Sequence, residues 1–277
     1  MELTLDKIEE FQKYLYKEEK SKSTIEKYTR DILAFFSFLE ERLLSKEELI
    51  EYKQFLMSRY KISSINSMLI SIHVFLDFIG QSQIKIKLLK QQKAIFLDKE
   101  KELTKNEYQR LLKVAKLKRN ERLYLLIQTI CATGIRVSEH QYLTVEAIKK
   151  GKAIIHNKGK AREIFFPDQL RKSLLIYCQK QHIVSGTIFI TKHGNPMNRS
   201  NIWANMKSLC YEANVNAGKV YPHNLRHLFA FTYYNIEKDL VRLADILGHS
   251  SIETTRIYTM TSSFECQKTL SKMKLIV

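Results

Sequence analysis

Apolar residues in the first 80 positions recur at the spacing of amphipathic helices. Four such stripes are present, at 5–15, 25–39, 49–56 and 65–79, and the second returns about every 3.6 residues. The last stripe stops at Gly80, a residue type that commonly follows the end of a helix. The pattern predicts a compact N-terminal bundle of four helices.

Serines placed three positions before a glutamate mark the beginnings of two of these helices. The pairs are Ser23 with Glu26 and Ser45 with Glu48. In such a capping box each side chain accepts a hydrogen bond from the other residue's backbone N–H, which satisfies donors that the helix leaves unpaired. We expect the second and third helices to start at these serines.

The stretch QSQIKIKLLKQQKAIFLDKEKE that follows the bundle is rich in Lys and Gln and has no helical stripe. Thr104 and Glu107 then form another capping box at the start of a new helix. We therefore predict an N-terminal helical domain at 1–85, a basic linker at 86–102 and a second domain at 103–277.

The second domain mixes helical stripes with short β-like runs. Ala153–His156 and Glu163–Phe166 are joined by Asn-Lys-Gly-Lys, which predicts a hairpin with a glycine-containing turn, and Thr187–Thr191 would add an edge strand. Helical stretches are expected at 104–117, 120–133, 199–213, 224–236, 239–247 and 252–258. The predicted fold class is mainly α, a helical bundle followed by a mostly helical domain with a small antiparallel β-sheet.

The charge of the chain points to nucleic acid. Lys and Arg total 46 against 29 Asp and Glu, so the formal net charge is +17. A protein that neutralises phosphates and releases counterions from DNA or RNA needs such an excess. The basic residues are spread along the chain rather than gathered on one amphipathic helix, which disfavours a membrane surface as the partner.

No segment predicts export, a membrane span or a metal site. No apolar run approaches the roughly 20 residues that cross a bilayer, and the N-terminus is acidic as well as basic, unlike a signal peptide. The cysteines, at 131, 178, 210 and 266, form no Cys-x-x-Cys pair, so neither a zinc site nor a disulfide framework is indicated. We expect a cytoplasmic protein with no metal and no cofactor.

Seven polar residues interrupt the apolar patterns of the second domain. They are Arg136 in ATGIRVSE, Lys158 in HNKGKAR, His223, Arg226 and His227 in PHNLRH, and His249 and Tyr258 in LGHSSIETTRIYT. Taken singly each has an ordinary explanation, because a terminal arginine usually pairs at the surface, a turn lysine is usually solvated and a histidine near a helix end usually caps or packs. Their order and spacing together carry the functional signal.

These segments resemble the tyrosine recombinase family, which includes the Xer recombinases and the integrases of phages and transposons. TGIRVSE is similar to the family's box around its first arginine, and PHNLRHLFA to the His-x-x-Arg segment of its second. LGHSSIETTRIYT is close to the segment LGH-S-x-x-T-T-x-x-Y, and STIEKYTRDILAFFSFL resembles the SAM-like core-binding domain of Xer-like members. The resemblance covers nearly the whole chain and implies a core-binding domain followed by a catalytic domain.

The resemblance implies a site-specific DNA recombinase or integrase that works through a 3′-phosphotyrosine, without metal or ATP. Tyr258 would be the nucleophile, and Arg136 and Arg226 would clamp the scissile phosphate with charged, bidentate guanidinium groups. Because a phenol with a pKa near 10 is a poor nucleophile, a base must assist it, and His223 is the candidate. His249 would hydrogen-bond the phosphate.

The general acid is open between two lysines of the hairpin. Lys158 matches the family's turn lysine and would protonate the leaving 5′ oxygen. The turn reads NKGKAR where family members often have GKGxKxR, one residue fewer, so Lys160 is the alternative. Glu139, in the RVSE segment, is expected to orient its neighbours from behind the site.

The implied partner is double-stranded DNA, bound by a homotetramer on two recombining sites. Lys20, Lys22, Lys27 and Arg30 are candidate phosphate contacts in the N-terminal bundle, although a solvated charged face explains them equally well. The tail after Tyr258 either docks on a neighbouring protomer, as in the family, or packs on its own domain.

Two other functions remain open. A type IB topoisomerase uses the same chemistry to relax DNA, and a decayed recombinase would bind DNA without cutting it. The helical N-terminal domain and the LGHSSIETT segment favour a recombinase over a topoisomerase. A decayed protein would have lost an arginine or the tyrosine, and here every candidate position is filled. Resolvase, invertase and short transposon integrase all fit.

Overall fold

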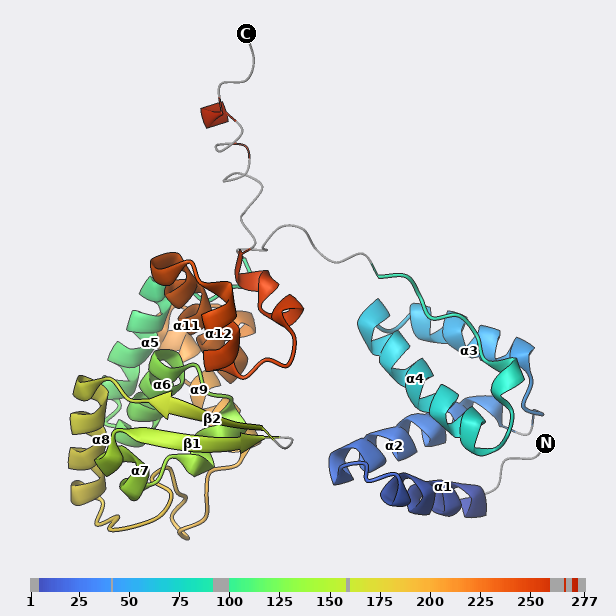
Figure 1. Cartoon of the computed structure of the whole chain (residues 1–277), viewed down its shortest axis with the longest axis horizontal. Helices are drawn as coiled ribbons and strands as arrows, with labels where there is room; N and C mark the ends of the chain where they lie inside the picture. Colours follow the sequence, from blue (N-terminus) through green and yellow to red (C-terminus); the bar gives the residue numbers. More distant parts are fainter. Residues whose placement is uncertain are drawn as a thin grey trace. The chain divides into compact units, whose positions relative to one another are not determined.

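The chain separates into two compact units, residues 1–93 and 94–277. Figure 1 draws the computed structural model, with the first unit in blue to cyan and the second in green to red. The break between the units falls inside the segment predicted as a linker, and the domain limits themselves stay a prediction. The structure describes residues 5–40, 42–91, 100–157, 160–259, 267 and 271–273, with only the backbone of Leu5, Asn157 and Lys160.

Four α-helices build the described part of the N-terminal unit, as the apolar stripes predict. Aromatic rings fill its core, where Phe11 lies 5.1 Å from Phe75 and Phe35 lies 4.9 Å from Tyr52, centroid to centroid. These contacts join the first helix to the fourth and the second to the third. The elements are α1 (Leu5–Lys17), α2 (Lys22–Leu39), α3 (Lys46–Met57) and α4 (Ile62–Phe78), then the 3-10 helix η1 (Ser82–Ile84).

One of the two predicted helix starts in this unit is right and the other is wrong. Ser45 caps α3 by accepting the backbone N–H of Glu48 at 3.2 Å. At α2 the cap is Ser21, whose hydroxyl accepts the N–H of Thr24 at 3.3 Å. Ser23 therefore lies inside the first turn. Ser21 has the same hydroxyl and already accepts a hydrogen bond from the free N–H groups at the helix start.

The C-terminal unit is built around α6. This helix contacts α5, α8, α9 and α11, and its Leu126 and Ile130 are fully buried. The α-helices are α5 (Lys105–Leu117), α6 (Glu121–Thr133), α7 (Val145–Lys150), α8 (Asp168–Lys180), α9 (Arg199–Lys207), α10 (Cys210–Ala213), α11 (Pro222–Glu237) and α12 (Leu240–Leu247). The 3-10 helices are η2 (Val137–Tyr142), η3 (Ala217–Lys219), η4 (Ile252–Thr254) and η5 (Arg256–Thr259).

The predicted hairpin is present as a two-stranded antiparallel sheet that contacts α7 and α12 (Figure 1). Strand β1 (Lys152–Asn157) pairs with β2 (Lys160–Phe165), and the closing pair is Asn157 with Lys160. The predicted edge strand at 187–191 is wrong for the described residues, since that segment makes only isolated bridges, such as Thr144 with Thr187.

Other differences from the expected elements concern helices of the C-terminal unit. The sequence did not predict α7 or α8, and the helix expected at 199–213 is interrupted between α9 and α10. The stretch expected as a helix at 252–258 forms two 3-10 turns instead. β-Branched residues such as Thr254 and Thr255 favour a regular α-helix less than straight-chain residues do. The predicted fold class, mainly α with a small antiparallel sheet, is confirmed.

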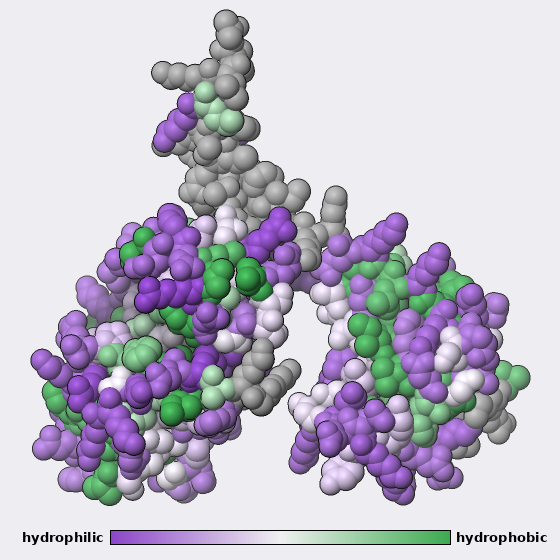
Figure 2. Space-filling view, in the orientation of Figure 1, coloured by the Kyte–Doolittle hydropathy of each residue, from purple (hydrophilic) through white to green (hydrophobic). Residues whose placement is uncertain are grey.

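On the face that Figure 2 draws, hydrophilic residues cover most of both units, and hydrophobic residues show in patches of the C-terminal unit and on a longer stretch of the N-terminal unit. Exposed apolar side chains of that unit include Leu33, Met57 and Ile70. Within the described part of the chain, no helix has the length and the apolar character that crossing a membrane requires.

Candidate active site

Arg226 is fixed deep inside the C-terminal unit, in α11, with only 1% of the residue exposed. Its Nη1 donates to the carbonyl oxygen of Gly134 at 2.6 Å, and its Nη2 donates to that of Leu247 at 2.6 Å. These carbonyls belong to the C-terminal ends of α6 and α12, where backbone oxygens lack partners within the helix. Arg226 therefore ties two helix ends together.

Glycines make this arrangement possible at both helix ends. Gly134 (φ +65°) and Gly248 (φ +62°) follow α6 and α12 in the left-handed conformation that favours glycine. A Cβ on Gly134 would lie 2.4 Å from the ring of Phe229, and one on Gly248 would lie 2.8 Å from the side chain of Arg162. The carbonyl of Gly248 accepts a hydrogen bond from Nη2 of Arg136 at 3.1 Å.

A buried carboxylate holds Arg136 at the start of η2. The backbone N–H of Arg136 donates to Oε2 of Glu139 at 2.7 Å, and its Nη1 donates to Oε1 at 3.0 Å. From β2, Arg162 donates to both oxygens of the same carboxylate, at 2.8 and 2.7 Å. Burial raises the pKa of Glu139, but the hydrogen bonds from Arg162 and Arg136 bring it below its ordinary value. Glu139 thus stays ionised between two arginines.

Arg136 and Arg226 together form a positively charged centre. Burial, and then the charge of Arg136, lowers the pKa of Arg226 to about 10, so it is still protonated at neutral pH. The side chain of Arg136 is 31% exposed, and Nε of Arg226 is buried with no hydrogen-bond partner among the described residues. Two charged guanidinium groups with a donor to spare are suited to bind an anion such as a phosphate.

His249, just after α12, completes this centre. Its Nε2 lies 3.1 Å from Nη2 of Arg226, and its Nδ1 lies 2.8 Å from Oγ1 of Thr255. Because a guanidinium can only donate, Nε2 accepts and the ring proton sits on Nδ1, facing Thr255. Burial, and then the charges of Arg226 and Arg136, lowers the pKa of His249 to about 4, so the ring is neutral at pH 7.

Tyr258 lies in η5 beside the same centre and is 4% exposed. It packs with Ala230, Leu243 and Leu247. Burial raises the pKa of its phenol to about 12, although the charge of Arg226 acts in the opposite direction. The neighbouring arginine therefore stabilises a phenolate that burial disfavours.

Two histidines of α11 form a chain of ring contacts that ends at Tyr258. The rings of His223 and His227 are 4.6 Å apart, edge to face, and that of His227 is 5.3 Å from Tyr258 at an interplanar angle of 87°. Part of the His223 side chain is open to solvent. Burial of the rest of the ring, and then the neighbouring positive charges, lower its pKa to about 4. Nδ1 of His227 lies 3.4 Å from the Glu102 carboxylate.

The structure therefore brings together five of the six predicted catalytic positions, Arg136, His223, Arg226, His249 and Tyr258. The sixth, Lys158, lies outside the described residues. For its alternative, Lys160, only the backbone is described, at the first position of β2.

The four basic residues predicted to bind DNA differ in their surroundings. Lys20, Lys22 and Arg30 are exposed. The ammonium of Lys27 instead donates to Asp31 at 2.5 Å and to Ser71 at 2.9 Å, between α2 and α4. Asp31 and Ser71 are buried, so Lys27 serves the packing of the bundle.

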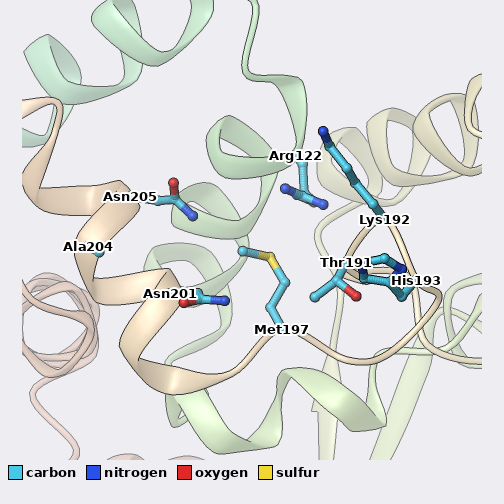
Figure 3. A pocket seen from close by; sticks show the side chains of 8 residues that line it. All are labelled: Arg122, Thr191, Lys192, His193, Met197, Asn201, Ala204 and Asn205. Carbon is cyan, nitrogen blue, oxygen red and sulfur yellow. The ribbon is translucent and has the colours of Figure 1, made fainter.

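A cavity of about 420 Å³ lies elsewhere in the C-terminal unit, at the N-terminal end of α6. Figure 3 shows Met197 in its middle, with Asn201 and Asn205 of α9 on one side and a loop carrying Lys192 on the other. None of the candidate catalytic residues lines it. Within the described parts of the chain, no cluster of three or more His, Cys, Asp or Glu side chains could hold a metal ion.

Sequence reasoning assigned no role to three residues that shape this site, Arg162, His227 and Glu102. Arg162 belongs to the NKGKAR segment, so the turn motif carried a signal for it. His227 follows Arg226 directly, but its contact with Glu102 joins positions 125 apart in the chain, and no local pattern indicates such a contact.

Comparisons with known proteins show the family of the chain. A family model described as "Phage integrase family" matches residues 101–263, and one described as "Phage integrase, N-terminal SAM-like domain" matches residues 8–83. The tyrosine recombinase XerA of Pyrococcus furiosus is 30% identical, over 97% of this chain and 94% of the relative. XerD of Staphylococcus saprophyticus is 27% identical, over 94% and 96%.

Solved structures share the fold at lower identity. The XerH site-specific recombinase bound to its difH substrate before cleavage has a TM-score of 0.71 at 20% identity, over 91% of this chain and 79% of that one. The Tn1549 transposon integrase in complex with transposon right end DNA has a TM-score of 0.73 at 15% identity, over 97% and 99%. The chain thus belongs to the phage integrase family and is a site-specific recombinase of the tyrosine type.

Proposed function

We propose that this recombinase cuts and rejoins double-stranded DNA through a 3′-phosphotyrosine on Tyr258. The observation that carries the proposal is the convergence of two charged arginines, Arg136 and Arg226, beside the buried Tyr258 and the neutral His249. An anion is the natural occupant of such a centre, and the net charge of +17 favours a polyanion as the partner.

The arginines supply the electrostatic part of the reaction. Both guanidinium groups would donate to the non-bridging oxygens of the scissile phosphate, where negative charge grows in the transition state. Because Glu139, Gly134 and Leu247 already hold them, they need little reorganisation when the phosphate arrives. To donate to the same oxygens, His249 would carry its ring proton on Nε2, the nitrogen that faces Arg226, instead of on Nδ1.

Two proton transfers accompany the displacement. The phenol oxygen of Tyr258 would form a bond to phosphorus while its proton passes to His223, which is neutral at pH 7 because its pKa is about 4. The bond from phosphorus to the 5′ oxygen breaks, and Lys158, or else Lys160, would protonate that oxygen. The phosphotyrosine conserves the energy of the broken bond, so a free 5′ hydroxyl can reverse the step without ATP, and the cationic groups make a metal unnecessary.

The two units divide the work in this proposal. We assign core DNA binding to residues 1–85, a linker to 86–102 and catalysis to 103–277. Two solved structures of the same fold contain DNA, namely XerH bound to difH and the Tn1549 integrase in complex with transposon right end DNA. We propose that four copies act together on two recombining duplexes.

The test is covalent adduct formation. Duplexes from the DNA flanking the gene, nicked to trap the intermediate, are incubated with protein in EDTA and resolved on a denaturing gel. We expect a shifted band with the wild type and with Tyr211→Phe, a control at a tyrosine that is 95% exposed in the same unit. Tyr258→Phe should abolish the band.

Clear binding to these duplexes without any adduct from the wild type would instead support a decayed, DNA-binding recombinase. Relaxation of supercoiled plasmid without exchange between two sites would support a topoisomerase. An adduct that survives Tyr258→Phe would show that another residue is the nucleophile.

A further inference from the structure

The end of the predicted linker is fastened to the helix that carries His223 and Arg226. Nδ2 of Asn224, which is fully buried, donates to the carbonyl oxygen of Lys101 at 2.9 Å. At the next position, the Glu102 carboxylate lies 3.4 Å from Nδ1 of His227, one turn further along α11. Two adjacent residues thus contact α11 on the side of the candidate base and nucleophile.

His227 links this carboxylate to the reacting tyrosine. Its ring meets the rings of His223 and Tyr258 edge to face, at 4.6 and 5.3 Å. Nε2 of His227 is buried and has no hydrogen-bond partner among the described residues. A carboxylate beside Nδ1 favours the tautomer with the proton on that nitrogen, which leaves Nε2 with a free lone pair.

We propose that Glu102 and His227 form a carboxylate–imidazole pair that positions Tyr258 and His223 for strand cleavage. The inference rests on the proposed function, because it takes Tyr258 as the nucleophile. Glu102 fixes the orientation of the His227 ring, and the ring edge in turn fixes the two side chains between which the phenolic proton moves. Neither member touches the DNA phosphate, so both are positioning residues.

The charge of Glu102 also reaches both ends of that proton transfer. It raises the pKa of Tyr258, in the same direction as burial does. It also raises the pKa of His223, against the larger decrease that burial causes. Removing the carboxylate therefore lowers both pKa values, a change that a merely structural contact would not produce. The other charged or titratable groups around this cluster, among the described residues, are Tyr221 and Arg226 at α11, Arg136 at η2 and His249 after α12.

The experiment is single-turnover adduct formation by the full chain on the nicked duplex, followed from about pH 3 to pH 9, a range that includes the pKa of about 4 for His223. We expect Glu102→Gln to slow the reaction about 10- to 100-fold at pH 7, the loss typical of a misplaced reacting group, and to move the inflection of the pH–rate profile to lower pH. Glu102→Asp keeps the charge and should keep the inflection of the wild type. The matched control is Glu121→Gln, a carboxylate in the first turn of α6 that pairs with Lys180 at 3.1 Å.

A double-variant cycle tests the pair itself. We expect Glu102→Gln combined with His227→Leu to be no slower than the slower single variant, because each change already removes the interaction that the two residues share. His227→Asn, which keeps a donor near the Nδ1 position, should recover part of the rate lost in His227→Leu. Gel-shift binding and thermal unfolding identify a variant that fails to fold, and Glu102→Asp and His227→Asn then decide the question.

The inference is overturned if Glu102→Gln reacts at the rate and with the pH profile of the wild type, or if the two losses add. If the wild type itself forms no adduct, the proposed function is wrong. That result differs from the failure of the Glu102–His227 inference, in which the wild type still forms the adduct.

Discussion

At the scale of single residues, Arg226 joins a structural role and its proposed chemical role in one side chain. Its two terminal nitrogens hold the ends of α6 and α12 through Gly134 and Leu247, and one of them also contacts His249. The guanidinium is therefore in place before any phosphate arrives, which is the arrangement that stabilises a transition state with the least reorganisation. The same bonds explain how a charged group can be 1% exposed.

The histidines of the site should titrate far from the ordinary value near 6.5. For the DNA-free protein we expect the ring signals of His223 and His249 in ¹H–¹³C NMR to stay those of neutral imidazole from pH 8 down to about pH 5, since both pKa values are about 4. The folded state then binds fewer protons than the unfolded state between pH 4 and 6.5, so stability is lost as the pH falls through that window. A midpoint near 6.5 for either ring would contradict the burial and charge effects described.

The sequence motifs predicted those site residues that stand in short segments with a recognisable spacing. Arg136, Arg226, His249 and Tyr258 stand in short segments with fixed spacing, and the fold brings them together. The Glu102–His227 contact could not be predicted, because it depends on how the segment before α5 packs on α11.

At the scale of elements, helix ends decide the geometry of the site, and glycines set the ends. Gly134 and Gly151 both follow a helix with positive φ, +65° and +77°. They differ in space, because a Cβ at Gly134 would lie 2.4 Å from Phe229 while nothing lies within 4 Å at Gly151. An alanine would therefore be strained by the positive φ at either position, but of the two only an alanine at position 134 would also clash with a neighbouring side chain.

We expect Gly151→Ala to cost about 1 kcal/mol of unfolding free energy in urea, the usual strain of a left-handed alanine. Gly134→Ala should cost about 1–3 kcal/mol more, the range for overpacking, and should reduce adduct formation, because Phe229 or the carbonyl that holds Arg226 must move. Equal destabilisation of the two variants would show that the site tolerates the displacement.

Elements differ in how well the sequence predicts them, for physical reasons. Long amphipathic stripes predicted α1 to α4 correctly because one face of each helix is buried in the bundle. The turns η4 and η5 have four residues or fewer, and tertiary contacts fix them, such as that of Tyr258 in η5 with the ring of His227. The 187–191 segment has an apolar strand pattern but finds only isolated pairing partners, so it forms no strand.

At the scale of the whole molecule, a net charge of +17 predicts DNA binding that weakens steeply with salt, since each neutralised phosphate contributes a slope of about −0.9 in log K against log salt. Replacing the exposed Lys20, Lys22 and Arg30 together by Ala should make the slope shallower by about 0.9 for each phosphate that these side chains neutralise in the wild type. Lys27→Met is the matched control, because its ammonium is bound to Asp31 and Ser71. It should lower stability by about 1–3 kcal/mol, the usual effect of an unsatisfied buried group, and leave the slope unchanged. A slope that changes with Lys27→Met and not with the triple variant would show that Lys27, between α2 and α4, contacts DNA phosphates and that the three exposed side chains do not. Fluorescence anisotropy of a labelled duplex, at salt concentrations from well below to well above the physiological range, measures both slopes.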